Sequence, residues 1–334
     1  MIIVRAPVRI PIGGGGTDWP SYYLQYGGGW ASAAIDKYIY VTINKRFEKP
    51  IRISYSKTEE VSNVDEIQHP IVREALKLVG ITSNIEIISI ADVPSGTGLG
   101  SSGAFTVALL TALYAYLKRT TNAIIPSSRK KIAEQACHIA MHLLKEPSGK
   151  QDEYIAAYGG MISCYADRNG NVSVTPLFPS RITPETAKKL EDNLLMFYTG
   201  IRRDSRDILQ EHSDAVWKKE PVITETLHRT GAICKEIIEA LSQSDFHQFA
   251  DLVNAHWQER LKRKGDSTPQ IDKWYNIARE NGALGGKLVG AGGGGFLLFY
   301  CEDKKEQLRK AMAGQGLKEQ PFRFEIEGVK IIAS

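Results

Sequence analysis

Residues 92–103 read DVPSGTGLGSSG and separate the apolar stretch Ile85–Ala91 from the apolar residues 104–117. The first stretch is short and rich in isoleucine, which predicts a strand, and the second is apolar on nearly every side, which predicts a buried helix. A strand, a glycine- and serine-rich loop and a helix in this order direct backbone N–H groups and the helix dipole toward an anion. The stretch therefore predicts a phosphate-binding loop within an α/β fold.

Two common nucleotide-binding motifs do not account for this loop. Gly98, Gly100 and Gly103 have the spacing of the dinucleotide motif GxGxxG, but a Rossmann unit also needs an acidic residue about 20 positions further on. No Asp or Glu stands between Val93 and Ala133. The P-loop pattern GxxxxGK[ST] is absent as well. The loop therefore indicates a nucleotide site of another kind.

Two further glycine clusters lie near the ends of the chain. They comprise residues 13–16 with 27–29, and Gly285, Gly286 and Gly290 with residues 292–295. Glycine costs backbone entropy and buries no side chain, so such clusters are expected where the backbone turns sharply or approaches a ligand closely.

The composition is that of a globular protein. The chain has 334 residues, 43% hydrophobic and 24% charged, which suggests about two domains. Its 42 basic and 38 acidic residues leave a net charge of +4, too small to predict a nucleic-acid partner. Residues 104–117 are too short to cross a bilayer, and Arg5 and Arg9 interrupt the first apolar run, so neither a membrane partner nor a secretory signal is expected. Four widely separated cysteines favour reduced thiols and the cytoplasm.

Strands are also predicted near both ends of the chain. Residues 2–5 and the residues around 322–325 and 329–332 are β-branched or alternate between apolar and polar types. The pattern between them changes near residues 165–180, from mixed strands and helices to long helical stretches. This change predicts a domain boundary there.

Three motifs together resemble the GHMP kinase superfamily, which includes galactokinase, homoserine kinase, mevalonate kinase and phosphomevalonate kinase. In the order expected, they are RAPVRI with GGGTD at residues 5–10 and 14–18, PSGTGLGSSG at 94–103 and KLVGAGGGG at 287–295. Within the superfamily, the GGGTD form is most similar to the D-glycero-D-manno-heptose 7-phosphate kinases. Fucokinases carry a related form.

The resemblance implies an α/β (α+β) fold of two domains with the active site between them. Residues 1–170 would form a mixed α/β domain that carries the phosphate loop and the catalytic Asp, and residues 171–334 a ferredoxin-like α+β domain with added helices. The implied reaction is transfer of the γ-phosphoryl group of ATP to the anomeric hydroxyl of D-glycero-D-manno-heptose 7-phosphate, which gives the 1,7-bisphosphate. The alternatives are another sugar 1-kinase, of the fucose or galactose type, and a non-catalytic protein that senses sugar and ATP. The expected partners are ATP and a sugar phosphate, and the protein is expected to be a monomer or a homodimer.

The resemblance also assigns roles to residues. Asp152 falls on the family's catalytic aspartate, which orients and deprotonates the acceptor hydroxyl, and Arg9 matches the basic residue that keeps it ionised. Ser102 would ligate Mg²⁺. The residues expected to bind the ATP phosphates are Pro94, Gly96, Gly98, Leu99, Gly100, Ser101, Ser102 and Gly103.

The acceptor would be bound by the first and third motifs and by a pair of arginines. Arg202 and Arg203 follow a predicted strand, and a guanidinium is suited to bidentate binding of a 7-phosphate. The remaining residues expected to bind substrate are Gly15, Gly16, Thr17, Asp18 and Gly293.

One departure from the family pattern concerns the metal. Related kinases carry a Mg²⁺-ligating glutamate some ten to fourteen residues before the catalytic aspartate, but here that stretch holds His138 and His142 and no carboxylate. The i, i+4 spacing could suit a transition metal, whereas Mg²⁺ prefers oxygen, so ordinary surface or packing histidines are expected. Either Ser102, ATP and water hold Mg²⁺ alone, or a carboxylate such as Asp92 substitutes, or activity is weakened.

Overall fold

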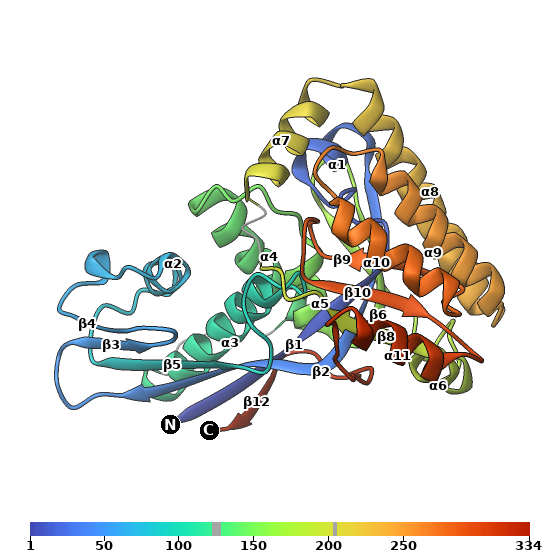
Figure 1. Cartoon of the computed structure of the whole chain (residues 1–334). Helices are drawn as coiled ribbons and strands as arrows, with labels where there is room; N and C mark the ends of the chain where they lie inside the picture. The colour runs from blue at the N-terminus through green and yellow to red at the C-terminus, as the bar shows by residue number, and fades with distance from the viewer. Residues whose placement is uncertain (122–127, 203–205) are drawn as a thin grey trace.

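Two β-sheets with helices packed on them make up the computed structural model, which describes residues 1–121, 128–202 and 206–334 (Figure 1). The larger sheet is built on β1 (Ile2–Gly13) and β2 (Gly28–Lys45), which pair antiparallel along most of their length. The strand predicted over residues 2–5 therefore continues through Pro7 and Pro11. The register shifts next to each of these prolines, because proline cannot donate a ladder hydrogen bond.

The strand order of the larger sheet is β12-β1-β2-β5-β3-β4, with β6 and β7 extending from β2. All pairs are antiparallel except β3 with β5. The pairing of β12 with β1 brings the two ends of the chain together (Figure 1). The other strands are β3 (Ile51–Ser54), β4 (Thr58–Val61), β5 (Ile85–Ala91), β6 (Met161–Ala166), β7 (Val172–Pro176) and β12 (Lys330–Ala333).

The helix after the phosphate loop is α3 (Ser101–Thr121), which packs on β1 and β2. Its residues from Gly103 to Leu110 are all buried, which confirms the predicted buried helix. The remaining helical elements of this half are α1 (Pro20–Tyr26), the 3-10 turn η1 (Val64–Glu66), α2 (Pro70–Val79), α4 (Arg129–His138), the π turn η2 (Ile139–Leu143) and α5 (Gln151–Tyr158).

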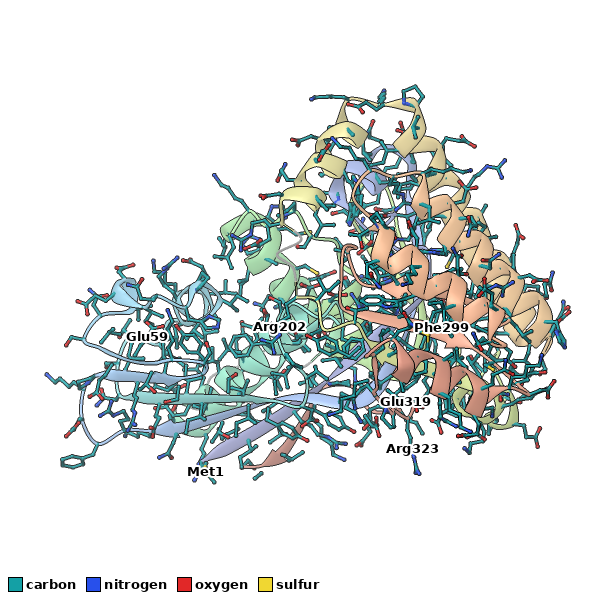
Figure 2. All side chains as sticks on the ribbon, in the orientation of Figure 1. Met1, Glu59, Arg202, Phe299, Glu319 and Arg323 are labelled. Carbon is teal, nitrogen blue, oxygen red and sulfur yellow. The ribbon has the colours of Figure 1, made fainter. Side chains whose placement is uncertain are left out.

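The second sheet has four antiparallel strands in the order β11-β8-β10-β9. Its strands are β8 (Leu194–Tyr198), β9 (Gly285–Val289), β10 (Phe296–Tyr300) and β11 (Lys318–Glu319). Strand β10 is buried along its whole length, and Phe299, labelled in Figure 2, lies in a separate apolar core of this half. The helices are α6 (Pro184–Asn193), α7 (Arg206–Trp217), α8 (Pro221–Ser242), α9 (Phe246–Leu261), α10 (Pro269–Glu280) and α11 (Lys305–Gly314).

The mixed sheet and the separate helix-covered antiparallel sheet confirm the predicted fold class. The strand predicted over residues 322–325 is wrong, because that segment makes only an isolated bridge between Phe324 and Ile35. The domain division at residue 170 stays a prediction, and β7 and β12, which follow it, pair within the larger sheet. No helix of the described residues is long and apolar enough to cross a membrane.

Candidate functional site

A cavity of about 360 Å³ takes its walls from both halves of the chain. It lies where β1 approaches β9, since Lys287 Nζ of β9 donates to the carbonyl oxygen of Ile12 at 2.6 Å. The fold thus collects side chains from distant positions in one place. The predicted site residues that line the cavity are Arg9, Gly15, Gly16, Asp18, Gly98, Gly100, Ser102, Gly103 and Asp152.

An ion pair between Arg9 and Asp152 lies in this wall. Arg9 Nε is 2.8 Å and Arg9 Nη2 is 2.5 Å from the same oxygen, Asp152 Oδ1. Arg9 Nη1 donates to the carbonyl oxygen of Gly98 at 2.5 Å. No hydrogen bond from the described residues reaches Asp152 Oδ2. One buried guanidinium therefore joins the carboxylate to the glycine loop and leaves one carboxylate oxygen for another partner.

The loop passes so close to Asp152 that two positions require glycine. A Cβ at Gly103 would lie 2.7 Å from Asp152 Cβ, and a Cβ at Gly100 would lie 2.9 Å from Asp152 Cγ. On the loop's other side, a Cβ at Gly290 would lie 2.4 Å from the Cα of Gly98. The second and third motifs therefore pack backbone against backbone next to the ion pair.

The other residues expected at the ATP phosphates do not line the cavity. Pro94 and Gly96 are exposed at the start of the loop. Leu99 is fully buried, and its carbonyl oxygen accepts a hydrogen bond from Arg9 N at 3.0 Å. Ser101 begins α3, where the first N–H groups of a helix have no partner within it. The phosphate contacts of these four residues stay predictions.

Asp18 ties the first motif to the helix that carries Asp152. Its Oδ1 accepts from Gly16 N at 2.9 Å, and its Oδ2 accepts from Gln151 N at 3.1 Å, at the first residue of α5. Burial raises the pKa of this carboxyl group, and the nearby charge of Asp152 adds to the effect, while the backbone donors oppose it. Asp18 also lines the cavity, so a ligand there would meet a carboxylate already held by two N–H groups.

The remaining predicted residues of the first and third motifs lie differently. A Cβ at Gly15 would meet no atom within 4 Å, so that part of the cavity wall is open. Thr17 is fully buried, and its hydroxyl lies 2.8 Å from the carbonyl oxygens of both Gly14 and Gly29. Gly293 N donates to the carbonyl oxygen of Asp266 at 3.2 Å. Neither Thr17 nor Gly293 lines the cavity, and their contacts with substrate stay predictions.

Of the two arginines expected at a substrate phosphate, the structure describes Arg202 alone. Arg202, labelled in Figure 2, is exposed where the chain has left β8, and it does not line the cavity. Arg203 lies outside the described residues.

Glu153 is a buried acid next to Asp152 that sequence reasoning missed. Its side chain lines the cavity, and Oε2 has no hydrogen-bond partner. Burial raises its pKa to about 8, and the charges of Asp152 and then Asp18 add to the effect. Glu153 is therefore mostly protonated at pH 7, which removes one negative charge from the neighbourhood of Asp152.

The histidine pair gives no sign of a metal centre. His138 and His142 are exposed, and their ring centroids are 5.3 Å apart where α4 runs into the π turn η2. Within residues 1–121, 128–202 and 206–334, no group of three His, Cys, Asp or Glu side chains could hold a metal ion.

Asp92, the carboxylate suggested in place of the family's magnesium-binding glutamate, does not reach the cavity. Asp92 Oδ2 accepts from Tyr38 N at 2.9 Å, and Asp92 does not line the cavity. Glu146, which sequence reasoning missed, does line it and accepts from Arg206 Nη2 at 2.8 Å. Ser102 also lines the cavity, at the first turn of α3.

A group of basic side chains from the second half completes the wall. It consists of His256, Arg260, Arg263 and Lys287, all buried and all lining the cavity. Arg260 Nε donates to Asp266 Oδ2 at 3.2 Å and Nη1 donates to the carbonyl oxygen of Leu288 at 2.9 Å.

Sequence reasoning missed this basic group because its members read as surface charges. The run ERLKRK at residues 259–264 has the composition of a solvated helix end. A signal was available at Lys287, since a lysine between Gly286 and Leu288 stands in an apolar strand. Such a position predicts a buried cation, which needs a partner.

Comparison with known proteins finds one family model in each half of the chain. A family model described as the GHMP kinases N terminal domain matches residues 69–160, and one described as GHMP kinases C terminal matches residues 237–317. D-glycero-alpha-D-manno-heptose 7-phosphate kinase from Campylobacter jejuni is 31% identical over 98% of both chains. L-fucokinase/L-fucose-1-P guanylyltransferase from Bacteroides fragilis is 27% identical over 91% of this chain and 35% of its own length. The structure of a D-glycero-D-manno-heptose 1-phosphate kinase from Bacteroides thetaiotaomicron has the same fold, with a TM-score of 0.79 and 22% identity over 100% of this chain and 99% of that one.

Proposed function

Because the chain belongs to the GHMP kinase superfamily and is therefore a kinase, we propose that it phosphorylates the anomeric hydroxyl of D-glycero-D-manno-heptose 7-phosphate with ATP. The product is the 1,7-bisphosphate. The observation that carries the proposal is the pair of Arg9 and Asp152 beside the glycine loop, in a chain 31% identical to a heptose 7-phosphate kinase.

Asp152 is the base of the proposed reaction. Its Oδ1 is occupied by Arg9, and Oδ2 accepts the proton of the acceptor hydroxyl. The acceptor oxygen then forms its bond to the γ-phosphorus as the bond from that phosphorus to the bridging oxygen of ADP breaks. The proton passes to Asp152 and from there to solvent, and no phosphoenzyme forms. Positioning and charge stabilisation supply the catalysis in such phosphoryl transfers.

The glycine loop holds the ATP phosphates in this mechanism. The loop lines the cavity at Gly98, Gly100 and Gly103, and the N-terminus of α3 directs N–H groups toward the phosphates. Arg9 Nη1 bonds the carbonyl oxygen of Gly98, so a movement of the loop also moves the carboxylate. The same arginine thereby couples the donor side of the cavity to the base.

Magnesium is the expected companion of ATP. The donors near the loop are oxygen atoms, the Ser102 hydroxyl and the carboxylates of Asp152 and Glu146, and this donor set fits Mg²⁺. Mg²⁺ commonly binds through few protein ligands together with substrate phosphates and water, so Ser102 and ATP are its proposed main ligands. When bound, the ion neutralises charge on the β- and γ-phosphates.

Gly15, Gly16 and Asp18 bind the sugar in this proposal. Asp18 accepts hydrogen bonds from sugar hydroxyls with the lone pairs that Gly16 N and Gln151 N leave. A sugar 1-kinase that takes an unphosphorylated sugar is the second candidate, favoured by the 27% identity to an L-fucokinase over 91% of this chain.

The test is ADP release from ATP and Mg²⁺ by the purified protein with a panel of acceptors. The panel holds heptose 7-phosphate, mannose 6-phosphate, sedoheptulose 7-phosphate, fucose, galactose, mannose and mevalonate. Turnover with the heptose phosphate alone supports the proposal. Turnover with only an unphosphorylated sugar replaces it with the second candidate, and ATP binding without turnover of any acceptor refutes both.

A further inference from the structure

Arg263 is a buried cation in the cavity wall for which the described residues supply no carboxylate at ion-pair distance. Its side chain is held by two threonines of α8, with Nε 3.1 Å from Thr226 Oγ1 and Nη2 2.7 Å from Thr230 Oγ1. The residue is 6% exposed. Burial of a guanidinium without a counterion is unfavourable, and desolvation lowers the pKa of Arg263 to about 10.

The two threonines fix the direction of the free end of Arg263. Thr226 Oγ1 donates its own proton to the carbonyl oxygen of Ile223 at 2.8 Å, and Thr230 Oγ1 donates to that of Thr226 at 2.7 Å. Both hydroxyls can therefore only accept from Arg263, which leaves its Nη1 amino group. A Cβ at Gly16 would lie 3.5 Å from Nη1, so this group borders the first motif.

Two neighbouring buried groups also lack an anionic partner. Lys287 Nζ donates to the carbonyl oxygen of Ile12, and no carboxylate of the described residues lies at ion-pair distance from it. His256 is 3% exposed, and neither of its ring nitrogens has a hydrogen-bond partner. Burial and the charges of Lys287, Arg260 and Arg263 lower the pKa of His256 well below its usual range, so its ring is neutral.

The other cations of the cavity wall are already paired. Arg9 bonds Asp152, Arg206 bonds Glu146 and Arg260 bonds Asp266. Of the remaining lining acids, Asp18 accepts a backbone N–H on each oxygen, and among the described residues neither Asp18 nor Glu153 lies at ion-pair distance from Arg263 or Lys287. The wall formed by Arg263, Lys287 and His256 therefore offers hydrogen-bond donors to the cavity, and its positive charge is mainly that of Arg263, because burial lowers the pKa of Lys287 to about 7.

We propose that Arg263, together with His256 and Lys287, binds a phosphate monoester of the acceptor sugar. The location favours the acceptor over ATP, because Arg263 borders Gly16 of the first motif, whereas the glycine loop packs against Asp152 and Gly290. Two N–H groups of Nη1 match phosphate oxygens, and the neutral imidazole donates a further N–H. The inference rests on the proposed sugar-kinase activity and moves the expected phosphate contact from Arg202 and Arg203 to this wall.

The experiment compares kcat/KM for the heptose 7-phosphate with that for the same heptose without phosphate. Wild-type protein is expected to prefer the phosphorylated sugar by about 100-fold or more, the order that loss of buried charge-assisted contacts produces. Arg263→Gln should abolish most of this preference through KM for the sugar phosphate and leave KM for ATP unchanged. The paired change Thr226→Val with Thr230→Val should reduce the preference less, because the guanidinium remains but loses its orientation.

Arg181→Gln is the matched control, since Arg181 is an exposed arginine that pairs with Glu239 at 3.1 Å. It should keep the wild-type preference. A preference that survives Arg263→Gln, or one that Arg202→Gln alone abolishes, overturns the inference.

A second measurement on the wild-type protein does not depend on any variant folding. sn-Glycerol 3-phosphate, a simple phosphate monoester, should inhibit competitively against the sugar phosphate and not against ATP. Competition against ATP alone overturns the inference. Turnover of sugars without any preference for a phosphate refutes this inference only, whereas absence of turnover with every sugar refutes the proposed function itself.

Discussion

Glu153→Gln should stabilise the protein in a pH-dependent way. Glu153 is buried beside Asp152, and one of its carboxylate oxygens has no hydrogen-bond partner. A glutamine has nearly the same shape as the protonated acid and does not titrate. The variant therefore isolates the cost of keeping an ionisable group at this position.

The magnitude follows from the pKa of Glu153, which is raised from 4.5 to about 8 in the folded protein, first by burial and then by the charge of Asp152. Between these two pH values the folded state binds more protons than the unfolded state, so the contribution of Glu153 to stability falls as pH rises. A pKa difference of about 3.5 corresponds to about 5 kcal/mol. The stability gained by Glu153→Gln should thus increase from pH 4.5 and level off above pH 8, approaching this value.

The assay is urea denaturation of both proteins, followed by circular dichroism, at intervals from pH 5 to pH 9. Glu239→Gln serves as the control, because the Glu239 side chain is 56% exposed and its removal should not change the pH dependence. At pH 7 the kcat of Glu153→Gln should stay within a few-fold of wild type, since Glu153 is already mostly protonated. A stability difference that is the same at pH 5 and pH 8.5 would show that the pKa of Glu153 is not raised in the folded protein.

Three further predictions concern the residues around the glycine loop. Asp152→Asn should lower kcat by about 10²–10⁴-fold in the ADP-release assay with little change in KM for ATP, and an unchanged kcat would exclude it as the base. Arg9→Met removes the group that holds Asp152 Oδ1 at 2.8 Å, so the carboxylate should lose its orientation and kcat should fall by up to about 10²-fold, and an unchanged kcat would count against the pairing. Gly103→Ala places a Cβ 2.7 Å from Asp152 Cβ and should cost about 1–3 kcal/mol of unfolding free energy and reduce kcat. Gly314→Ala, where a Cβ meets no atom within 4 Å, should do neither in the same thermal denaturation and turnover measurements.

The phosphate loop could be predicted because its chemistry is local. A strand, a glycine-rich turn and an apolar helix leave a signal in consecutive residues, and β5 and α3 confirm both neighbours of the loop. Two of these positions need glycine for a reason that the sequence does not show. Gly100 and Gly103 make room for Asp152, which lies about 50 positions further along the chain.

Other parts of the site depend on long-range packing. The Thr17 hydroxyl lies 2.8 Å from the carbonyl oxygens of Gly14 and Gly29, an environment that the sequence does not reveal, and its contact with sugar stays a prediction. Glu153 and Arg263 are charged residues, and in the sequence such residues are expected at the surface. Both are buried because α5 and the end of α9 pack against the cavity. The periodicity of neither segment predicts this packing.

The family, the fold class and the residues of three glycine motifs could be predicted without the structure, because turns that need glycine and strands that need apolar residues leave their pattern in neighbouring positions of the sequence. Tertiary structure alone decided the electrostatics of the site. It brought Arg9 within 2.8 Å of Asp152 across 143 positions, raised the pKa of Glu153 by burial and left Arg263 in the wall with no carboxylate of the described residues at ion-pair distance. The physical reason is that the energy of a charge depends on its distance from other charges and on its exposure to water, and only the packed chain sets these two quantities.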